Sequence, residues 1–259
     1  MRIVLLIDDP PNPTEPEAIE GLAGCRALPG EVTELLAEPR DRFVAAMAAH
    51  ERASVDEAAG SPAALRGVAI DFAWAADWLS AQAAAYPRTS NADEFVADEV
   101  LGALGGDFDV TSKALFAALD EGAMVPAERI SQLYRRLIWT FSATLTSFER
   151  KTFAHLPHDA NKAMNLNAYI GLMGHDYAVL DTRVGLILRE TDVQPTLHVP
   201  DSDYLLTLDA DSVLLREYCL RLAYHLALPG NERIAVIQTP YSAFRGAPTR
   251  LERIAGATT

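Results

Sequence analysis

Apolar positions along the chain follow two patterns, continuous runs near both ends and helical periodicity in the long middle. Residues 2–7 (RIVLLI) form an apolar run with β-branched residues, which is typical of a buried parallel strand. Residues 203–208 (DYLLTL) and 233–239 (RIAVIQT) have the same character, and shorter strands are predicted at 183–190 and 196–199. These runs predict a sheet with strands from both ends of the chain.

The stretch from residue 15 to about 150 is different, because alanine is frequent and apolar residues recur at helical spacing. The pattern predicts helices over 38–60, 62–86 and 91–104. A further helix is predicted over 126–153, where one face carries Ile130, Leu133, Tyr134, Leu137, Ile138, Phe141, Leu145 and Phe148.

Strand and helix patterns alternate again after residue 150, with helices predicted over 161–174 and 212–228. We therefore expect an α/β fold, with a mostly parallel, Rossmann-like sheet interrupted by a large all-helical insertion. The expected organisation is a strand and acidic loop over 1–14, the insertion over 15–150, and the rest of the α/β core over 151–259.

Composition narrows the functional classes. Hydrophobic residues make up 49% of the 259 residues, enough for a packed core, and no stretch is long and apolar enough to span a membrane. The net charge of −14 argues against a nucleic-acid partner, although a few cations and a metal can still reverse the field in one cleft. Cys25 and Cys219 are distant in sequence, and we interpret them as reduced thiols in a cytosolic environment.

Asp209 and Asp211 follow the apolar run 203–208 directly. A strand that ends in D-x-D places both carboxylates at the carboxyl edge of a sheet, where open α/β sheets bind ligands. Residues i and i+2 of an extended segment point the same way, so both could bind one Mg²⁺ or Mn²⁺ together with substrate phosphates. The alternative is that one aspartate caps the following helix and the other is solvated.

A second acidic pair, Asp8 and Asp9, ends the first apolar run. Between the two pairs, residues 160–168 (ANKAMNLNA) place Lys162 at a helix start, where the helix dipole favours anions rather than cations. This placement suggests contact with a phosphate. A solvated surface lysine is the other possibility.

Two enzyme families contain such a D-x-D strand. Residues 205–213 (LLTLDADSV) resemble the opening motif of the haloacid-dehalogenase-like phosphatases, in which Asp209 would be the nucleophile and Asp211 the acid. That family requires a lysine and a second acidic pair further along the chain, but residues 212–259 contain neither Lys nor Asp.

A longer resemblance, with its elements in the right order, is to the processive inverting glycosyltransferases of family 2, the cellulose-synthase-like group. It is carried by the segments LLIDDPP (5–11), NKAMNLNA (161–168), DYLLTLDADS (203–212), AVIQTPYSAF (235–244) and LERIAGATT (251–259).

The resemblance implies a GT-A fold and the transfer of a sugar, expected to be glucose, from a nucleotide diphosphate sugar such as UDP-glucose to a growing polysaccharide. It implies a Mg²⁺ or Mn²⁺ ion held by Asp209 and Asp211. The residues implied to contact the donor or line its cleft are Asp8, Asp9, Lys162, Asn165, Asp209 and Gln238.

The chain also departs from the family pattern. Pro10 stands where the family has glycine. The family's first strand would precede residue 1, and its T-E-D general base and Q-x-x-R-W helix would follow Thr259, so we expect this chain alone to be inactive. The family's transmembrane helices imply that the full-length protein is embedded at the cytoplasmic face of the inner membrane. A non-catalytic module that binds a nucleotide sugar and docks a partner is a further alternative.

Overall fold

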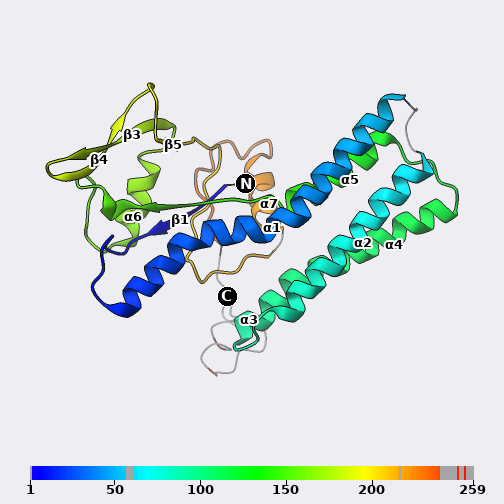
Figure 1. The fold of residues 1–259 in the computed structure, drawn as a ribbon, viewed down its shortest axis with the longest axis horizontal. Coiled ribbons are helices and arrows are strands. Elements are labelled where there is room, and N and C mark those ends of the chain that lie inside the picture. The colour runs from blue at the N-terminus through cyan, green and yellow to red at the C-terminus, as the bar shows by residue number, and fades with distance from the viewer. Residues whose placement is uncertain (1, 57–60, 216, 240–249, 251–253, 255–259) are drawn as a thin grey trace. The chain divides into compact units, whose positions relative to one another are not determined.

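The computed structural model describes residues 2–56, 61–215, 217–239, 250 and 254, and the fold is mixed α/β (Figure 1). The chain forms two compact units. Met1–Asp41 and Trp139–Leu205 make the first, which we call the α/β unit. Arg42–Ile138 and Leu206–Thr259 make the second, which we call the helical unit.

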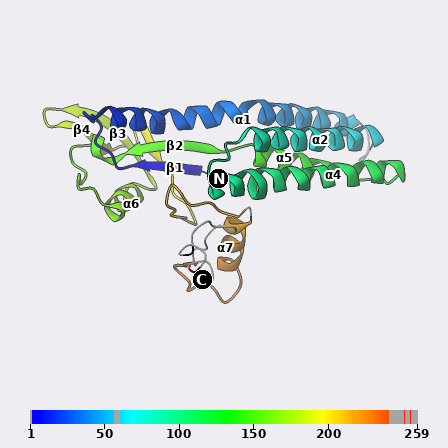
Figure 2. The ribbon, with the colours of Figure 1, turned by 90° about the horizontal axis from the view of Figure 1, so that it is seen from below.

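A two-stranded parallel sheet lies in the α/β unit. Strand β1 (Arg2–Ile7) pairs with β2 (Thr144–Glu149), and the register runs from Arg2 opposite Thr144 to Ile7 opposite Glu149. Figure 2 shows the two strands side by side. Because the strands are parallel and in this register, the residues that follow Ile7 and Glu149 leave the sheet at the same edge. The strand predicted at 2–7 is confirmed.

A second sheet in the α/β unit has three antiparallel strands in the order β4 (Gly185–Glu190), β3 (His175–Thr182), β5 (Leu197–Val199). The expectation of a mostly parallel sheet is therefore wrong for the described strands. Only two residues connect β3 to β4, and so short a connection can join only antiparallel neighbours. The strands predicted at 183–190 and 196–199 are present with shorter bounds.

One hydrophobic core joins these elements. Helix α6 (Lys162–Ile170) also lies in the α/β unit and contributes Tyr169 to that core. Val4 and Leu6 of β1 pack against the same cluster, whose buried members are Phe148, Phe153, Leu172, Tyr177, Leu188 and Val199. The core therefore fixes the ends of β1 and β2 relative to α6.

The long helix α1 (Pro16–Asp56) contributes residues to both units, which divide at Asp41. It starts well before the helix predicted at 38–60 and continues through Pro29 and Pro39. Each proline removes only one backbone hydrogen bond, and the intervening sequence is rich in strong helix formers.

The helical unit is built around the close packing of α2 (Pro62–Ala85) on α4 (Ala103–Asp120), with the rings of Phe72 and Phe108 edge-to-face at 5.3 Å between centroids. Its core also contains Phe43 and Ala75, both fully buried. The remaining helical elements of this unit and its borders are α3 (Asn91–Phe95), the π-helical η1 (Val96–Gly102), α5 (Ala127–Thr140) and α7 (Tyr218–Leu226).

The helix predicted over 126–153 is only half correct. α5 ends at Thr140, and Thr144–Glu149 form β2 instead. The apolar residues Phe141, Leu145 and Phe148 happen to continue the helical spacing, but the segment is also rich in β-branched threonine and finds a partner in β1.

Two strand predictions are wrong. Residues 203–208 and 233–239 form no strand, although the structure describes both segments. Their apolar side chains are largely exposed, and Leu205 keeps 52% of its surface accessible. An apolar run becomes a strand only when a neighbour pairs with its backbone, and neither segment pairs with a described strand.

The predicted segment 251–259 lies almost entirely outside the described residues, as does 240–244 at the end of the fourth family-like segment. Among the helices that the structure describes, none combines the length and apolarity needed to cross a bilayer.

Candidate functional site

The parallel pair β1–β2 brings an acid and two cations together at its carboxyl edge. Asp8 follows β1, and Arg150 and Lys151 begin the short 3₁₀ turn η2 (Arg150–Thr152) that follows β2. Ile7 and Glu149 are register partners, so the next residue of each strand meets across the edge.

Arg150 is the buried centre of this cluster, with no exposed surface. Its Nη2 donates to Asp8 Oδ1 and, at 2.8 Å, to the carbonyl oxygen of Asp159, while Nη1 donates to the carbonyl oxygen of Pro157. The guanidinium thus binds the carboxylate and also fixes the loop 157–159 that leads into α6.

Lys151 makes a second contact with the same residue. Its Nζ donates to the backbone carbonyl oxygen of Asp8 at 2.5 Å and lies 3.4 Å from Oδ1. Lys151 is buried as well. Two buried cations therefore surround one carboxylate, whose side chain keeps 29% of its surface exposed.

The N-terminus of α6 completes the cluster. Asn161 caps the helix by accepting from the Met164 N–H at 3.2 Å, and its own N–H donates to Asp8 Oδ2 at 3.2 Å. One turn later, the buried Asn165 donates from Nδ2 to the carbonyl oxygen of Leu6 at 3.2 Å. The segment 161–165 is thus tied to the end of β1 at two points.

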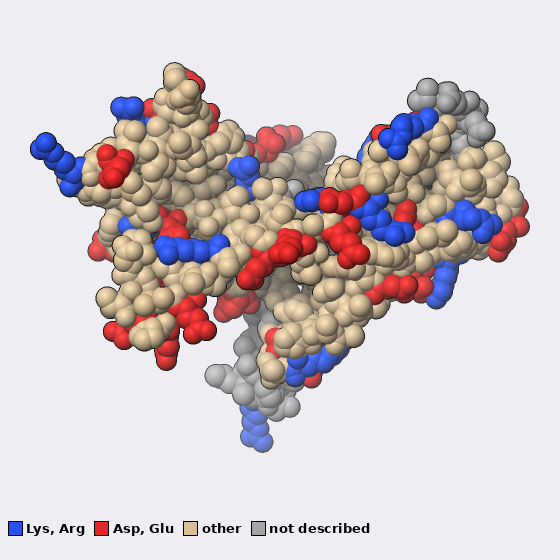
Figure 3. Space-filling model, in the orientation of Figure 1, with Lys and Arg blue, Asp and Glu red and all other residues tan. Residues whose placement is uncertain are grey.

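Two buried polar atoms in this cluster have no hydrogen-bond partner among the described residues, Nε of Arg150 and Oδ1 of Asn165. Such atoms are uncommon in folded proteins, and they mark a site where a ligand or water could complete the hydrogen bonding. On the face drawn in Figure 3, the basic and acidic side chains of the described residues are interspersed.

The predicted site residues fall in both units. Asp8 and Asn165 belong to the cluster just described. Asp9 and Lys162 are exposed, and each directly follows a residue of the cluster in the sequence. In the helical unit, Asp209, Asp211 and Gln238 are all exposed.

Asp209 and Asp211 lie in a turn rather than at the end of a strand, and the Ser212 N–H donates to the backbone oxygen of Asp209 at 3.0 Å. No group of three or more His, Cys, Asp or Glu able to hold a metal occurs within the described residues. Two carboxylates offer the oxygen ligands that Mg²⁺ and Mn²⁺ prefer, so they fit a cation that takes its remaining ligands from phosphate and water.

Arg150 and Lys151 are the functional candidates that the sequence prediction missed. The signal for them is a basic pair directly after residues 144–149, but the helical spacing of apolar residues predicts a helix over 126–153, which includes that segment. Assigning the segment to a strand would have placed both cations at the same edge as Asp8.

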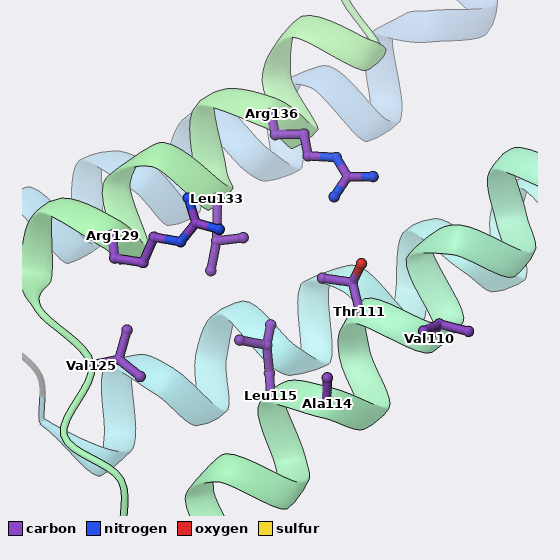
Figure 4. Close-up of a pocket in the computed structure, with 8 residues that line it drawn as sticks. All are labelled: Val110, Thr111, Ala114, Leu115, Val125, Arg129, Leu133 and Arg136. Carbon is purple, nitrogen blue, oxygen red and sulfur yellow. The ribbon is translucent and has the colours of Figure 1, made fainter.

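The helical unit contains a separate cavity of about 410 Å³ between α4 and α5 (Figure 4). Its lining is mainly apolar and comprises Val110, Thr111, Ala114, Leu115, Val125, Arg129, Leu133 and Arg136. No carboxylate or thiol is among these residues, so the cavity offers no acid–base pair, and the Asp8 cluster is the better candidate.

Comparison with protein-family models, with curated proteins and with solved structures found no match to this chain.

Proposed function

We propose that this chain supplies the nucleotide-sugar-binding part of a metal-dependent, inverting glycosyltransferase of the cellulose-synthase-like type, with a GT-A arrangement of its core. The donor is a uridine diphosphate sugar, with glucose as the expected sugar, and the acceptor is a growing polysaccharide.

One observation supports the proposal most directly. The segments 5–11 and 161–168 each resemble the family on their own residues, and Asp8 and Asn161 are 153 positions apart in the sequence. In the structure they are in hydrogen-bond contact, through Asp8 with Asn161 and Leu6 with Asn165. A chance similarity in either segment gives no reason for the two to meet at the carboxyl edge of a parallel pair.

The proposal assigns roles to the residues of each segment. Asp8 accepts a hydrogen bond from the base or ribose, and Asp9 follows it in the same loop. Lys162 neutralises phosphate charge, and Asn165 ties the helix that carries Lys162 to β1. Asp209 and Asp211 hold the cation, and Gln238 contacts the donor. When bound, a divalent cation offsets the charge that develops on the leaving diphosphate.

No residue of this chain is assigned as the general base, so binding tests the proposal better than turnover does. The experiment is calorimetric titration of the chain with uridine diphosphate in the presence of Mn²⁺, and again after chelation of the metal. We expect metal-dependent binding, and we expect Asp211→Asn to weaken it by about tenfold or more, as loss of an interaction between charged groups typically does.

Asp203→Asn is the matched control, because it removes an exposed carboxylate from the same segment outside the D-x-D pair. Its Kd should equal that of the wild type. A wild-type chain that binds no uridine diphosphate, or equal losses in Asp203→Asn and Asp211→Asn, would contradict the proposal.

A further inference from the structure

Asp8 is held at three different atoms by three residues, which come from two segments of the chain. Arg150 from the end of β2 binds Oδ1, the Asn161 N–H at the start of α6 binds Oδ2, and Lys151 binds the backbone carbonyl oxygen. Both the side chain and the main chain of this residue are therefore fixed in orientation.

The side chains of Arg150 and Asp8 differ in how far they are buried. The Arg150 side chain is fully buried, whereas that of Asp8 keeps 29% of its surface exposed. An ionised carboxylate has about four acceptor positions, more than Arg150, Lys151 and Asn161 occupy. Asp8 therefore remains able to accept a hydrogen bond from a ligand while the protein fixes its geometry.

We propose that Arg150 and Lys151 are positioning residues for nucleotide recognition. They hold the Asp8 carboxylate as a preorganised acceptor for an N–H or O–H group of the donor's nucleoside. This inference rests on the proposed function and goes beyond it, because neither residue lies in a family-like segment.

The physical basis is the entropy and strain that preorganisation removes from binding. Arg150 can bind the carboxylate and two carbonyl oxygens at once because its guanidinium is a planar fork with several donors. A lysine at this position keeps the charge but not the fork. Arg150→Lys should therefore loosen Asp8 without removing the compensating cation.

The test is a double-mutant cycle on uridine diphosphate binding, measured by calorimetry with the chain 1–259 and Mn²⁺. Asp8→Asn should raise the Kd by about tenfold or more, because it removes the charged acceptor. Arg150→Lys should raise the Kd as well. In the Asp8→Asn background, however, Arg150→Lys should have little further effect, because the group that it positions is already impaired.

Arg42→Lys is the matched control, since Arg42 forms the corresponding Arg–Asp pair of the helical unit with Asp71. Its Kd should remain within about twofold of the wild type even if its thermal midpoint falls. A purely structural role for Arg150 would lower the thermal midpoint of Arg150→Lys and leave the Kd unchanged.

Lys151→Met provides a second cycle in case Arg150→Lys does not fold. Its effect on the Kd should likewise disappear in the Asp8→Asn background. If the wild type binds uridine diphosphate and the effects of these variants multiply independently with that of Asp8→Asn, the positioning role is wrong and the proposed function stands. If the wild type does not bind, both fail.

Discussion

Among the described residues, an Arg–Asp pair joins distant parts of the sequence in each compact unit, and the two pairs differ in which partner is buried. In the α/β unit, the Arg150 side chain is fully buried and that of Asp8 is 29% exposed. In the helical unit, the Asp71 side chain is only 9% exposed and that of Arg42 is 38% exposed.

The pair in the helical unit is closed to ligands because its carboxylate is nearly buried and makes three contacts within the protein. Asp71 Oδ1 accepts from Arg42 Nε at 2.9 Å and Nη2 at 2.7 Å, and Oδ2 accepts from the Tyr134 hydroxyl at 3.2 Å. The Arg42 guanidinium also lies over the Trp74 ring, 4.8 Å from its centroid. This network ties α1, α2 and α5 together and has the features of a structural contact.

The pair in the α/β unit leaves its acid accessible. Because the buried partner is the cation, Arg150 orients the carboxylate from the protein interior, and the exposed part of the Asp8 side chain remains open to a ligand. The same two residue types therefore serve packing in one unit and, on our proposal, recognition in the other. The difference lies in whether the acid or the arginine of the pair is buried, and variants of each pair can test it.

The largest effect is expected from Arg42→Met, which leaves the nearly buried Asp71 without its cation. Loss of one partner from a buried pair typically costs about 3–5 kcal/mol, and we expect about 3 kcal/mol because Arg42 is partly exposed and water can replace it. Urea unfolding of the chain, followed by circular dichroism, measures this change.

Arg88→Met is the control for that measurement, since the Arg88–Asp98 pair lies in the same unit with both side chains well exposed. Its unfolding midpoint should shift much less. Equal shifts for Arg42→Met and Arg88→Met would mean that burial of Asp71 does not distinguish its pair.

A smaller effect is expected from Tyr134→Phe, which removes the hydroxyl donor to Asp71 and should cost about 1.5 kcal/mol, as for a hydrogen bond to a charged group. Burial, and then the neighbouring charge of Asp71, raise the pKa of Tyr134 above its usual value. The folded state thus favours the neutral phenol. Its contribution to stability is complete below the unfolded pKa of about 10 and is lost as the pH rises above that value.

The wild type should therefore lose stability above about pH 10, and Tyr134→Phe should lose less over the same interval. Unfolding in urea at a series of alkaline pH values measures both slopes. Tyr224→Phe is the control, because it removes the hydroxyl of an exposed tyrosine outside this network. A slope for Tyr134→Phe as steep as that of the wild type would contradict the assignment.

Several elements could be predicted from the sequence because their signals are local. The apolar run 2–7 and the helical periodicity of 62–86 agree with β1 and α2, and the start of α6 at Lys162 agrees with the helix predicted at 161–174. The position of Asp8 at the end of a strand followed from the same reasoning.

The elements that were predicted wrongly depend on partners that are distant in sequence. β2 is a strand because β1 lies next to it, and the residues 203–208 are not, because no described strand pairs with them. A local pattern shows apolar residues but not the neighbour that will satisfy the backbone. Arg150 was missed for the same reason, since its role follows from the register of β2 with β1 and from no motif of its own.

The smallest effect is expected at a third Arg–acid pair, which separates burial from the mere presence of an ion pair. Arg26 of α1 binds Glu149, the last residue of β2, through Nε at 2.7 Å and Nη2 at 2.6 Å. The geometry is bidentate and thus as favourable as in the buried pairs, but the Arg26 side chain is 45% exposed. Water and salt can replace the contact, so Arg26→Met should shift the urea midpoint less than Arg42→Met or Tyr134→Phe does, and 1 M NaCl should abolish the difference from the wild type. The same variant should leave uridine diphosphate binding unchanged, although residue 149 adjoins Arg150. A salt-resistant loss of stability in Arg26→Met would show that pair geometry, rather than burial, sets the contribution of these contacts.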